Sequence, residues 1–335
     1  MKKYLFTLAA ILLSMAASAD NSTKTYTVSV VYDGAKATVT IPEQLSGYVT
    51  CLSGESSHVK LIQAETVSDK TTGEIIYQLK GKTDNGEFYF TGDYKATLRL
   101  DGLTLANPDS SAIHIKDGKR IKVSMNPNTV NTLSDGVADT TSKGCFHCKG
   151  HTEFAGKGTL NISSKFNHAV FSKEYVEVKN CTLNITSAKK DGIHCKQYFL
   201  MTSGVLNISG AEDDGIQIEL KDTTVTGTIK DHEDENSGIF YMTGGTLTIN
   251  DVGGYCIKAA GTIQYSGTGK QNFDTANVKE NDTSAIIQPL NSRISPLTPN
   301  QVYDVSGRRL PHDAMLPRGI YIVKEGDTTR KIFVK

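Results

Sequence analysis

A short strand motif recurs along the middle of the chain at a regular spacing. Its copies lie at residues 159–163, 182–186, 205–209 and 246–250, and each has a leucine and an isoleucine two residues apart. The leucines are 23, 23 and 41 residues apart. The last interval is one repeat that carries an 18-residue insertion, at about 220–237. A period of this length is typical of a solenoid.

Two further motifs recur in step with the first, so each repeat contains three strands in a constant register. Apolar and polar residues alternate in each motif, which is typical of a strand with one buried face. The copies of the second and third motifs lie at 169–171, 192–194, 215–217 and 256–258, and at 176–178, 199–201 and 240–242.

Three short strands cannot enclose a core by themselves. Successive repeats stacked ~4.8 Å apart pair edge to edge and pile their inward residues into columns. Three strands in about 23 residues favour an all-β fold, a right-handed single-stranded parallel β-helix. A propeller blade takes four strands and about 40 residues, and a leucine-rich repeat needs a helical segment. The expected columns are Leu160, Leu183, Leu206, Leu247 and Ile162, Ile185, Ile208, Ile249.

The chain divides into five predicted segments. Lysines 2 and 3, a short apolar run and a small-residue cleavage pattern indicate a signal peptide. A β-rich cap covers the exposed edge of the first rung, with a hairpin around Asp33-Gly34 and two strands around Asn85-Gly86. The segments are the signal peptide at 1–19, the cap at 20–92, the β-helix at 93–269, a linker at 270–300 and a small C-terminal β domain at 301–335.

The charge balance and the hydropathy of the sequence limit the partners and the cellular location that we expect. The 36 basic and 36 acidic residues cancel, so no overall field attracts nucleic acid. After the leader, the sequence has no apolar stretch of about 18 residues, which predicts no transmembrane segment in the mature chain. We therefore expect a secreted or cell-surface protein with no nucleic-acid partner.

Six cysteines in an exported chain would suggest disulfides, but the repeat places them apart. Cys148 and Cys195 fall in one column two rungs apart, and Cys145 and Cys256 share another column several rungs apart. Neither pair meets the ~7 Å Cα limit for a disulfide. We expect buried free thiols.

Several motifs along the coil resemble a known family. Residues 97–107, 112–115 and 130–136, followed by 156–162, 166–170 and 213–216, are similar to a family of calcium-associated, carbohydrate-binding parallel β-helices with a pectate-lyase-like fold. The resemblance covers roughly residues 26–268. It implies binding of cellulose or polygalacturonate.

The end of the chain resembles a second family. Residues 302–310, 316–323 and 331–335 are similar to C-terminal sorting domains of type IX secretion. This resemblance implies export by the type IX secretion machinery, followed by attachment or release at the surface. The alternative is a small accessory β domain without a sorting role.

The β-helix resemblance implies calcium at the turn that precedes the second strand of a repeat. The matching residues are Asp191, Asp213 and Asp214. Asp191 and Asp214 lie one rung apart, and two like charges ~5 Å apart favour a cation between them. Lys189 or Lys190 could neutralise these carboxylates instead, with each aspartate capping turn backbone. Calcium is therefore one of two interpretations of this turn.

The predicted glycan-binding residues are outward amides and tyrosines. Asn161, Asn184 and Asn207 repeat at the rung spacing, and a disaccharide spans roughly two rungs; such a ladder can also simply stabilise the sheet. Tyr175 and Tyr198 are expected to form an exposed pair that stacks on sugar rings.

The histidines are not expected to form a zinc site. His168 aligns with the column of Asp191, whereas His147 and His194 are placed at different offsets in their rungs. The acidic insertion at 230–236 lacks the spacing of an EF-hand loop, so we expect a solvated loop there.

The sequence thus predicts a non-enzymatic protein that binds a plant-type or acidic polysaccharide, assisted by calcium. Two alternatives stay open. One is a structural, adhesin-like β-helix without a glycan ligand. The other is a calcium-dependent polysaccharide lyase, which needs a base; Lys189, Lys190 and Lys196 lie near the acidic turns.

Overall fold

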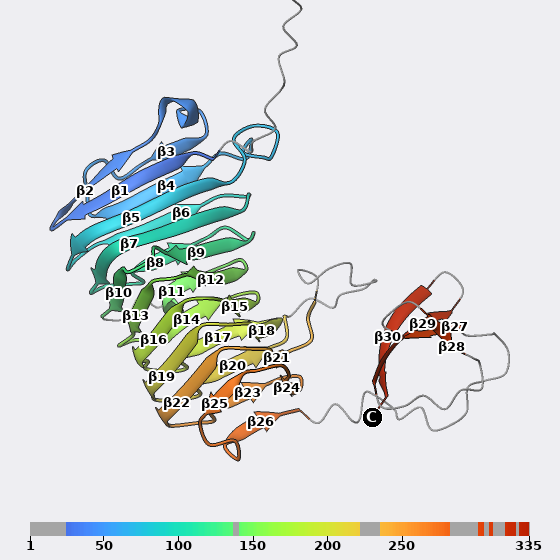
Figure 1. The fold of residues 1–335 in the computed structure, drawn as a ribbon. Coiled ribbons are helices and arrows are strands. Elements are labelled where there is room, and N and C mark those ends of the chain that lie inside the picture. Colours follow the sequence, from blue (N-terminus) through green and yellow to red (C-terminus); the bar gives the residue numbers. More distant parts are fainter. Residues whose placement is uncertain are drawn as a thin grey trace, which may run out of the picture. The chain divides into compact units, whose positions relative to one another are not determined.

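Parallel strands stacked in chain order form most of the molecule (Figure 1). The structure is a computed structural model that describes residues 25–136, 141–221, 235–281, 301–304, 308–310, 319–325 and 328–334. The predicted signal peptide and most of the predicted linker and acidic insertion lie outside these residues. Within them, no helix is long and apolar enough to cross a membrane.

The first motif of each repeat forms a ladder of hydrogen-bonded parallel strands, here named ladder one. Leu160 pairs with Leu183, Leu183 with Leu206 and Leu206 with Leu247, and the isoleucines pair in the same way. The leucine and isoleucine columns are fully or almost fully buried, as the spacing predicts. Ladder one comprises β10 (Val130–Asp135), β13 (Thr159–Ser163), β16 (Thr182–Ser187), β19 (Val205–Ala211), β22 (Thr246–Val252) and β25 (Lys270–Asn272).

The second motif forms ladder two, which lies in a separate sheet. Val170 pairs with Ile193, Ile193 with Ile216 and Ile216 with Ile257, so its inward column is also continuous. Ladder two comprises β4 (His58–Gln63), β6 (Glu87–Thr91), β8 (Ile113–Ile115), β11 (Gly144–Cys148), β14 (His168–Ser172), β17 (Ile193–Lys196), β20 (Ile216–Glu219), β23 (Ile257–Ala259) and β26 (Val278–Glu280).

The third motif forms ladder three, which one long strand joins to ladder one. The first half of β7 (Ala96–Asn107) pairs with ladder three and its second half pairs with ladder one. Gly102 lies between the halves with φ +73, where a residue with a side chain would be strained. Ladder three comprises β9 (Ile121–Met125), β12 (Thr152–Gly156), β15 (Val176–Val178), β18 (Tyr198–Met201), β21 (Ile239–Met242) and β24 (Ile263–Tyr265).

The N-terminal segment is part of the coil rather than a separate cap. β1 (Thr27–Asp33) pairs in parallel with β5 (Ile75–Thr83). β5 in turn pairs in parallel with β7. Only β2 (Lys36–Thr40) and β3 (Val49–Cys51) pair antiparallel, at the first edge, next to the 3₁₀ helix η1 (Glu43–Leu45). The hairpin around Asp33-Gly34 is present. The strands either side of Asn85-Gly86 belong to different sheets and form no hairpin.

The coil also extends further at its C-terminal end than the sequence indicated. β25 pairs in parallel with β22, and β26 with β23. Residues 270–280 are therefore rungs rather than linker, because each uncovered rung offers backbone groups that a further strand satisfies. The chain divides into two compact units at Asn281.

The second unit contains a four-stranded antiparallel sheet, with the order β28-β27-β29-β30. Its strands are β27 (Gln301–Asp304), β28 (Arg309–Leu310), β29 (Gly319–Glu325) and β30 (Thr328–Val334). These strands overlap the segments that resemble a sorting domain.

All six cysteines are free, and five of them are buried. Ser172 lies between Cys148 and Cys195 in one column, which places the two thiols two rungs apart, as predicted. Burial raises the pKa of Cys148 to about 12. These thiols therefore act as small apolar core residues.

Candidate functional site

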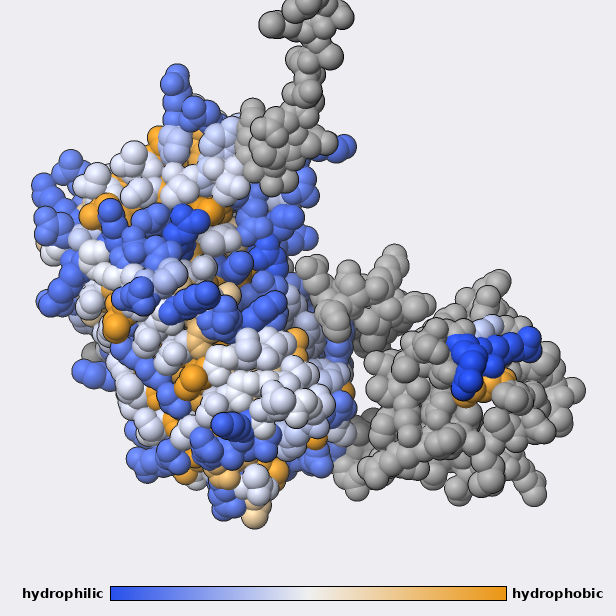
Figure 2. Space-filling view, in the orientation of Figure 1, coloured by the Kyte–Doolittle hydropathy of each residue, from blue (hydrophilic) through white to orange (hydrophobic). Residues whose placement is uncertain are grey.

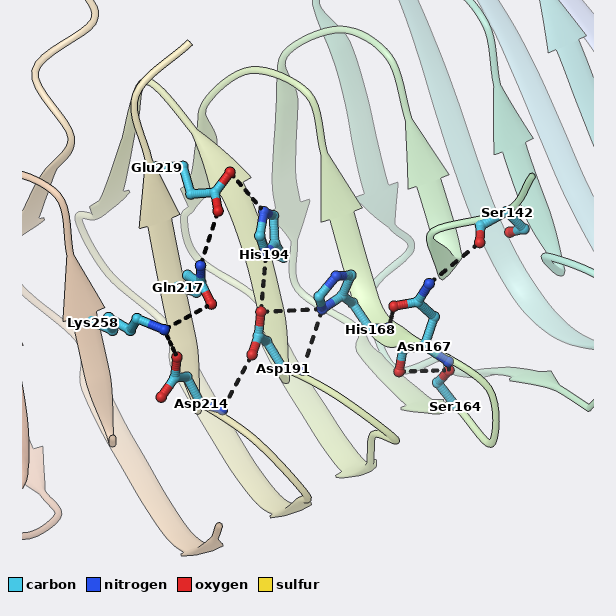
Figure 3. A network of polar contacts seen from close by, with 10 residues as sticks. All are labelled: Ser142, Ser164, Asn167, His168, Asp191, His194, Asp214, Gln217, Glu219 and Lys258. Carbon is cyan, nitrogen blue, oxygen red and sulfur yellow. Dashed lines mark hydrogen bonds and ion pairs between the residues drawn. The ribbon is translucent and has the colours of Figure 1, made fainter. Parts of the chain in front are cut away.

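A buried polar network lies where the strands of ladder two begin (Figure 3). The main-chain N–H of Asp214 donates to Asp191 Oδ1 at 3.1 Å, and the N–H of Tyr255 donates to Asp214 Oδ1 at 2.8 Å. Asp191 and Asp214 therefore lie one rung apart, and each carboxylate caps the backbone of the following rung. Both side chains are 1% exposed.

Asp191 is the centre of this network. Its Oδ2 atom lies 3.1 Å from His168 Nδ1 and 2.9 Å from His194 Nδ1. Burial alone would raise the pKa of Asp191, but the hydrogen bonds and charges of the two imidazoles hold it below its usual range. Burial also lowers the pKa of His168. The carboxylate thus stays charged in a site closed to bulk water.

Lys258, on β23, balances the negative charge of the Asp214 carboxylate. Lys258 Nζ lies 3.0 Å from Asp214 Oδ2 and 3.4 Å from Gln217 Oε1. The hydrogen bond to Asp214 raises the pKa of Lys258. Lys189, considered for this role from the sequence, instead pairs with Glu212 at the surface. The carboxylate of Asp214 is therefore neutralised from the next rung of ladder two.

The donors of this network fit calcium poorly. Carboxylate oxygens of Asp191, Asp213 and Asp214 approach within 4.8 Å of one another. Ca²⁺ takes six to eight oxygen ligands, however, and the two buried carboxylates already contact imidazole nitrogens, main-chain N–H groups and an ammonium. Only Asp213 is exposed. Calcium at these residues stays a prediction, and backbone capping with a lysine partner accounts for the geometry without it.

The sequence-based placement of the histidines was wrong in one respect. His147 pairs with Phe171 and Phe171 pairs with His194, so the two histidines share one outward column, which His114 continues. The interval from His147 to Phe171 is 24 residues rather than 23. One of the turns between these two residues therefore holds an extra residue, and an alignment that assumes a constant 23-residue period places His147 one position away from its true column.

The predicted asparagine ladder is present on ladder one. Asn184 Nδ2 donates to Asn161 Oδ1 at 2.8 Å, and Asn207 Nδ2 donates to Asn184 Oδ1 at 2.9 Å. The three amides are half-buried and satisfy one another along the coil. This geometry stabilises the sheet, and the role of the amides in glycan binding stays a prediction.

The tyrosine pair is stacked but is not exposed. The rings of Tyr175 and Tyr198 are 4.7 Å apart and nearly parallel, yet the residues are only 5% and 3% exposed. His151 covers the outer face of Tyr175 at 4.4 Å, and the Tyr175 hydroxyl donates to Glu153 at 3.1 Å. Neighbouring rungs thus occupy the ring faces that a sugar would need, which corrects the expectation of an exposed pair.

A column of lysines follows the strands of ladder two. Lys116, Lys149 and Lys173 each come directly after a paired strand residue, and their main-chain N–H groups donate to the preceding rung at 2.8–2.9 Å. Lys196 occupies the same position one rung further, at the end of β17. The first three are exposed and Lys196 is half-buried. We call these four residues the lysine column.

The lysine column is only partly neutralised. Lys196 lies 3.5 Å from Glu219, which takes the next place in the column. Lys149 and Lys173 have no acidic side chain within 4 Å among residues for which a structure is given. Like charges one rung apart repel unless an anion screens them.

A ring lies two residues before each lysine, on the same outward face. The rings of His114 and His147 are 4.4 Å apart and stacked, and those of Phe171 and His194 are 5.4 Å apart. Each ring is covered by its neighbours, so mainly ring edges reach solvent. On the face that Figure 2 shows, exposed apolar residues are dispersed among hydrophilic ones rather than gathered in one patch.

Comparison with known proteins gives the family. A family model described as carbohydrate-binding domain-containing protein matches residues 63–293, more than half of the chain. The chain belongs to this carbohydrate-binding domain family. The matched range contains all three ladders from β5 to β26 and both the buried network and the lysine column.

Two individual proteins agree with the family. A carbohydrate-binding domain-containing protein of Acetivibrio thermocellus is 24% identical over 110 residues, which are 30% of this chain and 38% of that protein. The chain thus matches well under half of that relative's length. The polysaccharide lyase-like protein from C. thermocellum, solved as a gadolinium derivative, superposes with a TM-score of 0.55 at 18% identity, over 76% of this chain and 99% of that one. This likeness shows the fold.

Sequence reasoning missed the lysine column and the role of Lys258. A signal for the column was available, since each lysine follows a strand motif by a constant offset. An alignment of the repeats shows this offset only if it accepts that Lys149 and Lys173 are 24 rather than 23 residues apart. Lys258 gave no local signal, because the insertion separates it from Asp214 by 44 residues.

Proposed function

We propose that this member of the carbohydrate-binding domain family is a non-catalytic protein that binds an acidic polysaccharide along the outer face of ladder two. The observation that carries the proposal is the lysine column. It places one lysine per rung at the ends of four successive strands of ladder two. A chain that carries one carboxylate per sugar presents the matching charge.

The spacing of the column suits an extended glycan. One rung rises ~4.8 Å, which is close to the length of one sugar in an extended polysaccharide chain. A polyuronate that lies along the coil would therefore meet successive lysines with successive sugars.

Exposure of the lysines favours binding over catalysis. Lysine acts as a general base when burial disfavours its charged form. Lys116, Lys149 and Lys173 are exposed, so they are suited to pairing with carboxylates. The protein would then hold the glycan without cleaving it.

The test is affinity for polygalacturonate, measured on the full protein at several salt concentrations. Lys149→Glu with Lys173→Glu should weaken binding at least about tenfold, because two attractive contacts of ~0.5–1 kcal/mol each become repulsive. Lys157→Glu with Lys179→Glu, two exposed residues that follow strands of ladder three, is the charge-matched control and should leave affinity unchanged. Wild-type affinity should fall as salt rises.

Three outcomes would contradict the proposal. Equal loss in the ladder-three control would show that only net charge matters. Binding of neutral β-glucan alone, lost in Asn184→Ala, would move the site to the asparagine ladder. Release of unsaturated uronides, followed by ultraviolet absorbance, would identify a lyase.

Our proposal for the location of the protein rests on two segments of the sequence. We propose that the leader directs export across the inner membrane and that the C-terminal unit directs passage through the type IX secretion machinery to the cell surface. The four-stranded sheet at the segments that resemble a sorting domain supports this proposal. A surface location would place the lysine column where polysaccharides are met.

A further inference from the structure

Two imidazoles and one carboxylate converge at the start of ladder two. His168 Nδ1 and His194 Nδ1 lie 3.1 Å and 2.9 Å from the same oxygen of Asp191, and the three ligand atoms all lie within 4.8 Å of one another. Figure 3 shows both rings directed at the carboxylate from neighbouring strands. The two histidine side chains are 10% exposed and Asp191 is 1% exposed.

The offsets that argued against a zinc site do not keep these groups apart. His194 is three residues after Asp191, and its ring turns back toward the carboxylate. His168 lies one rung before Asp191 in the same column, and its ring reaches the same carboxylate oxygen. His147 is in the column of His194 but two rungs away, so it takes no part.

The donor chemistry selects a borderline metal ion. Imidazole nitrogen suits Zn²⁺ and similar transition-metal ions, whereas Ca²⁺ requires oxygen ligands. Zn²⁺ binds nitrogen and carboxylate oxygen at ~2.0–2.2 Å, so tetrahedral ligand atoms lie ~3.3 Å apart. The two nitrogen–oxygen distances at Asp191 need to open by only a few tenths of an ångström.

The surroundings orient the nitrogens for this role. His194 Nε2 lies 3.5 Å from Glu219 Oε2, and a carboxylate on the far nitrogen of a histidine is the usual partner that fixes a metal-ligating tautomer. His168 Nδ1 faces both Asp191 Oδ2 at 3.1 Å and the main-chain N–H of Asp191 at 3.2 Å, and metal binding requires the unprotonated form of this nitrogen, which accepts the N–H. A metal ion would replace this long contact.

We propose that His168, Asp191 and His194 form a binding site for Zn²⁺ or a chemically similar transition-metal ion. The fourth position falls to a water molecule, because Asp213 groups with Asp191 and Asp214 rather than with the two histidines. Asp191, together with Glu219 beside His194 Nε2, balances the charge of the ion, while Lys258 balances Asp214. The ion would hold neighbouring rungs together across the turn that precedes the second strand motif. This inference does not depend on glycan binding.

The test uses the full protein without a histidine tag, treated with a chelator and then titrated with Co²⁺ alone. We expect a visible absorption band of four-coordinate cobalt that saturates at one equivalent and is displaced by Zn²⁺. His194→Gln retains a donor to Asp191 but should lose the band. His147→Gln, in the same column, is the matched control and should keep it.

Three results would overturn the proposal. They are the absence of a saturable band in the wild-type protein, an undiminished band in His194→Gln, and displacement of cobalt by Ca²⁺ at a similar concentration, which would restore the calcium interpretation. The wild-type titration needs no variant. Circular dichroism of the metal-free variants separates loss of the site from loss of the fold.

Discussion

At the scale of single residues, the least satisfied charge in the described core is Asp117. It is fully buried two residues after β8, and its Oδ2 atom has no hydrogen-bond partner among the described residues. Burial raises the pKa of Asp117 to about 6. In the unfolded chain the carboxyl ionises near pH 3.9. The folded protein therefore binds this proton more tightly than the unfolded chain does.

This difference predicts how stability depends on pH. The contribution of Asp117 is fully present below about pH 4 and is lost as the pH rises to about 6, by an amount on the order of 2–3 kcal/mol. Asp117→Asn cannot ionise, so its stability relative to wild type should increase from pH 4 to pH 8. Chemical denaturation of both proteins at the two pH values measures the change. An equal difference at both values would show that Asp117 does not titrate in this range.

At the scale of elements, the ladders hold the coil by repeating the same contact in every rung. Each strand satisfies the backbone of its two neighbours, and identical side chains meet at the same height in adjacent rungs. The asparagine ladder adds side-chain hydrogen bonds to this backbone pairing. The middle residue, Asn184, takes part in both of these bonds.

Removal of the Asn184 amide should therefore lower the free energy of unfolding more than removal of the Asn161 amide at the end of the ladder. Asn184→Ala removes two hydrogen bonds and should lower the free energy of unfolding by about 1–2 kcal/mol, whereas Asn161→Ala should lower it by about half as much. Ser163→Ala, on the same half-buried face of β13, is the control with little expected change. Urea denaturation measures all three. Equal effects of Asn184→Ala and Asn161→Ala would mean that the amides do not act as a ladder.

At the scale of the whole molecule, the chain consists of two compact units that meet in sequence at residues 281 and 282. The coil has its own continuous core, from Val28 to Ala259. All of the candidate site residues lie in the coil. The C-terminal sheet pairs only with itself among the described strands.

This division predicts separable roles for the two units. Removal of residues 301–335 should leave the melting temperature of the coil and its affinity for polygalacturonate unchanged, because no site residue or core column is lost. The same deletion should prevent export if the tail is a sorting domain. Fractionation of producing cells and thermal melting of the purified protein measure the two effects. Normal export of the shortened chain would identify the tail as an accessory domain.

The periodic part of the structure was accessible from the sequence. A constant spacing of strand motifs predicts which residues pair, because a stacked coil can bury its apolar faces only against the next rung. The leucine and isoleucine columns, the asparagine ladder, the column of Asp191 and Asp214 and the separated thiols all follow from this rule. The extent of the coil did not, because its first and last rungs depart from the motif.

The sequence by itself determined the fold and the height of each side chain in its column. Only the tertiary structure decided which side chains meet across columns and which remain exposed. Tyr175 is buried by His151, which belongs to another rung, and Lys258 reaches Asp214 across an insertion. His147 aligns with His194 because one turn holds an extra residue. Spacing fixes pairing along the coil, whereas contacts around it depend on the path of each turn, which no period records.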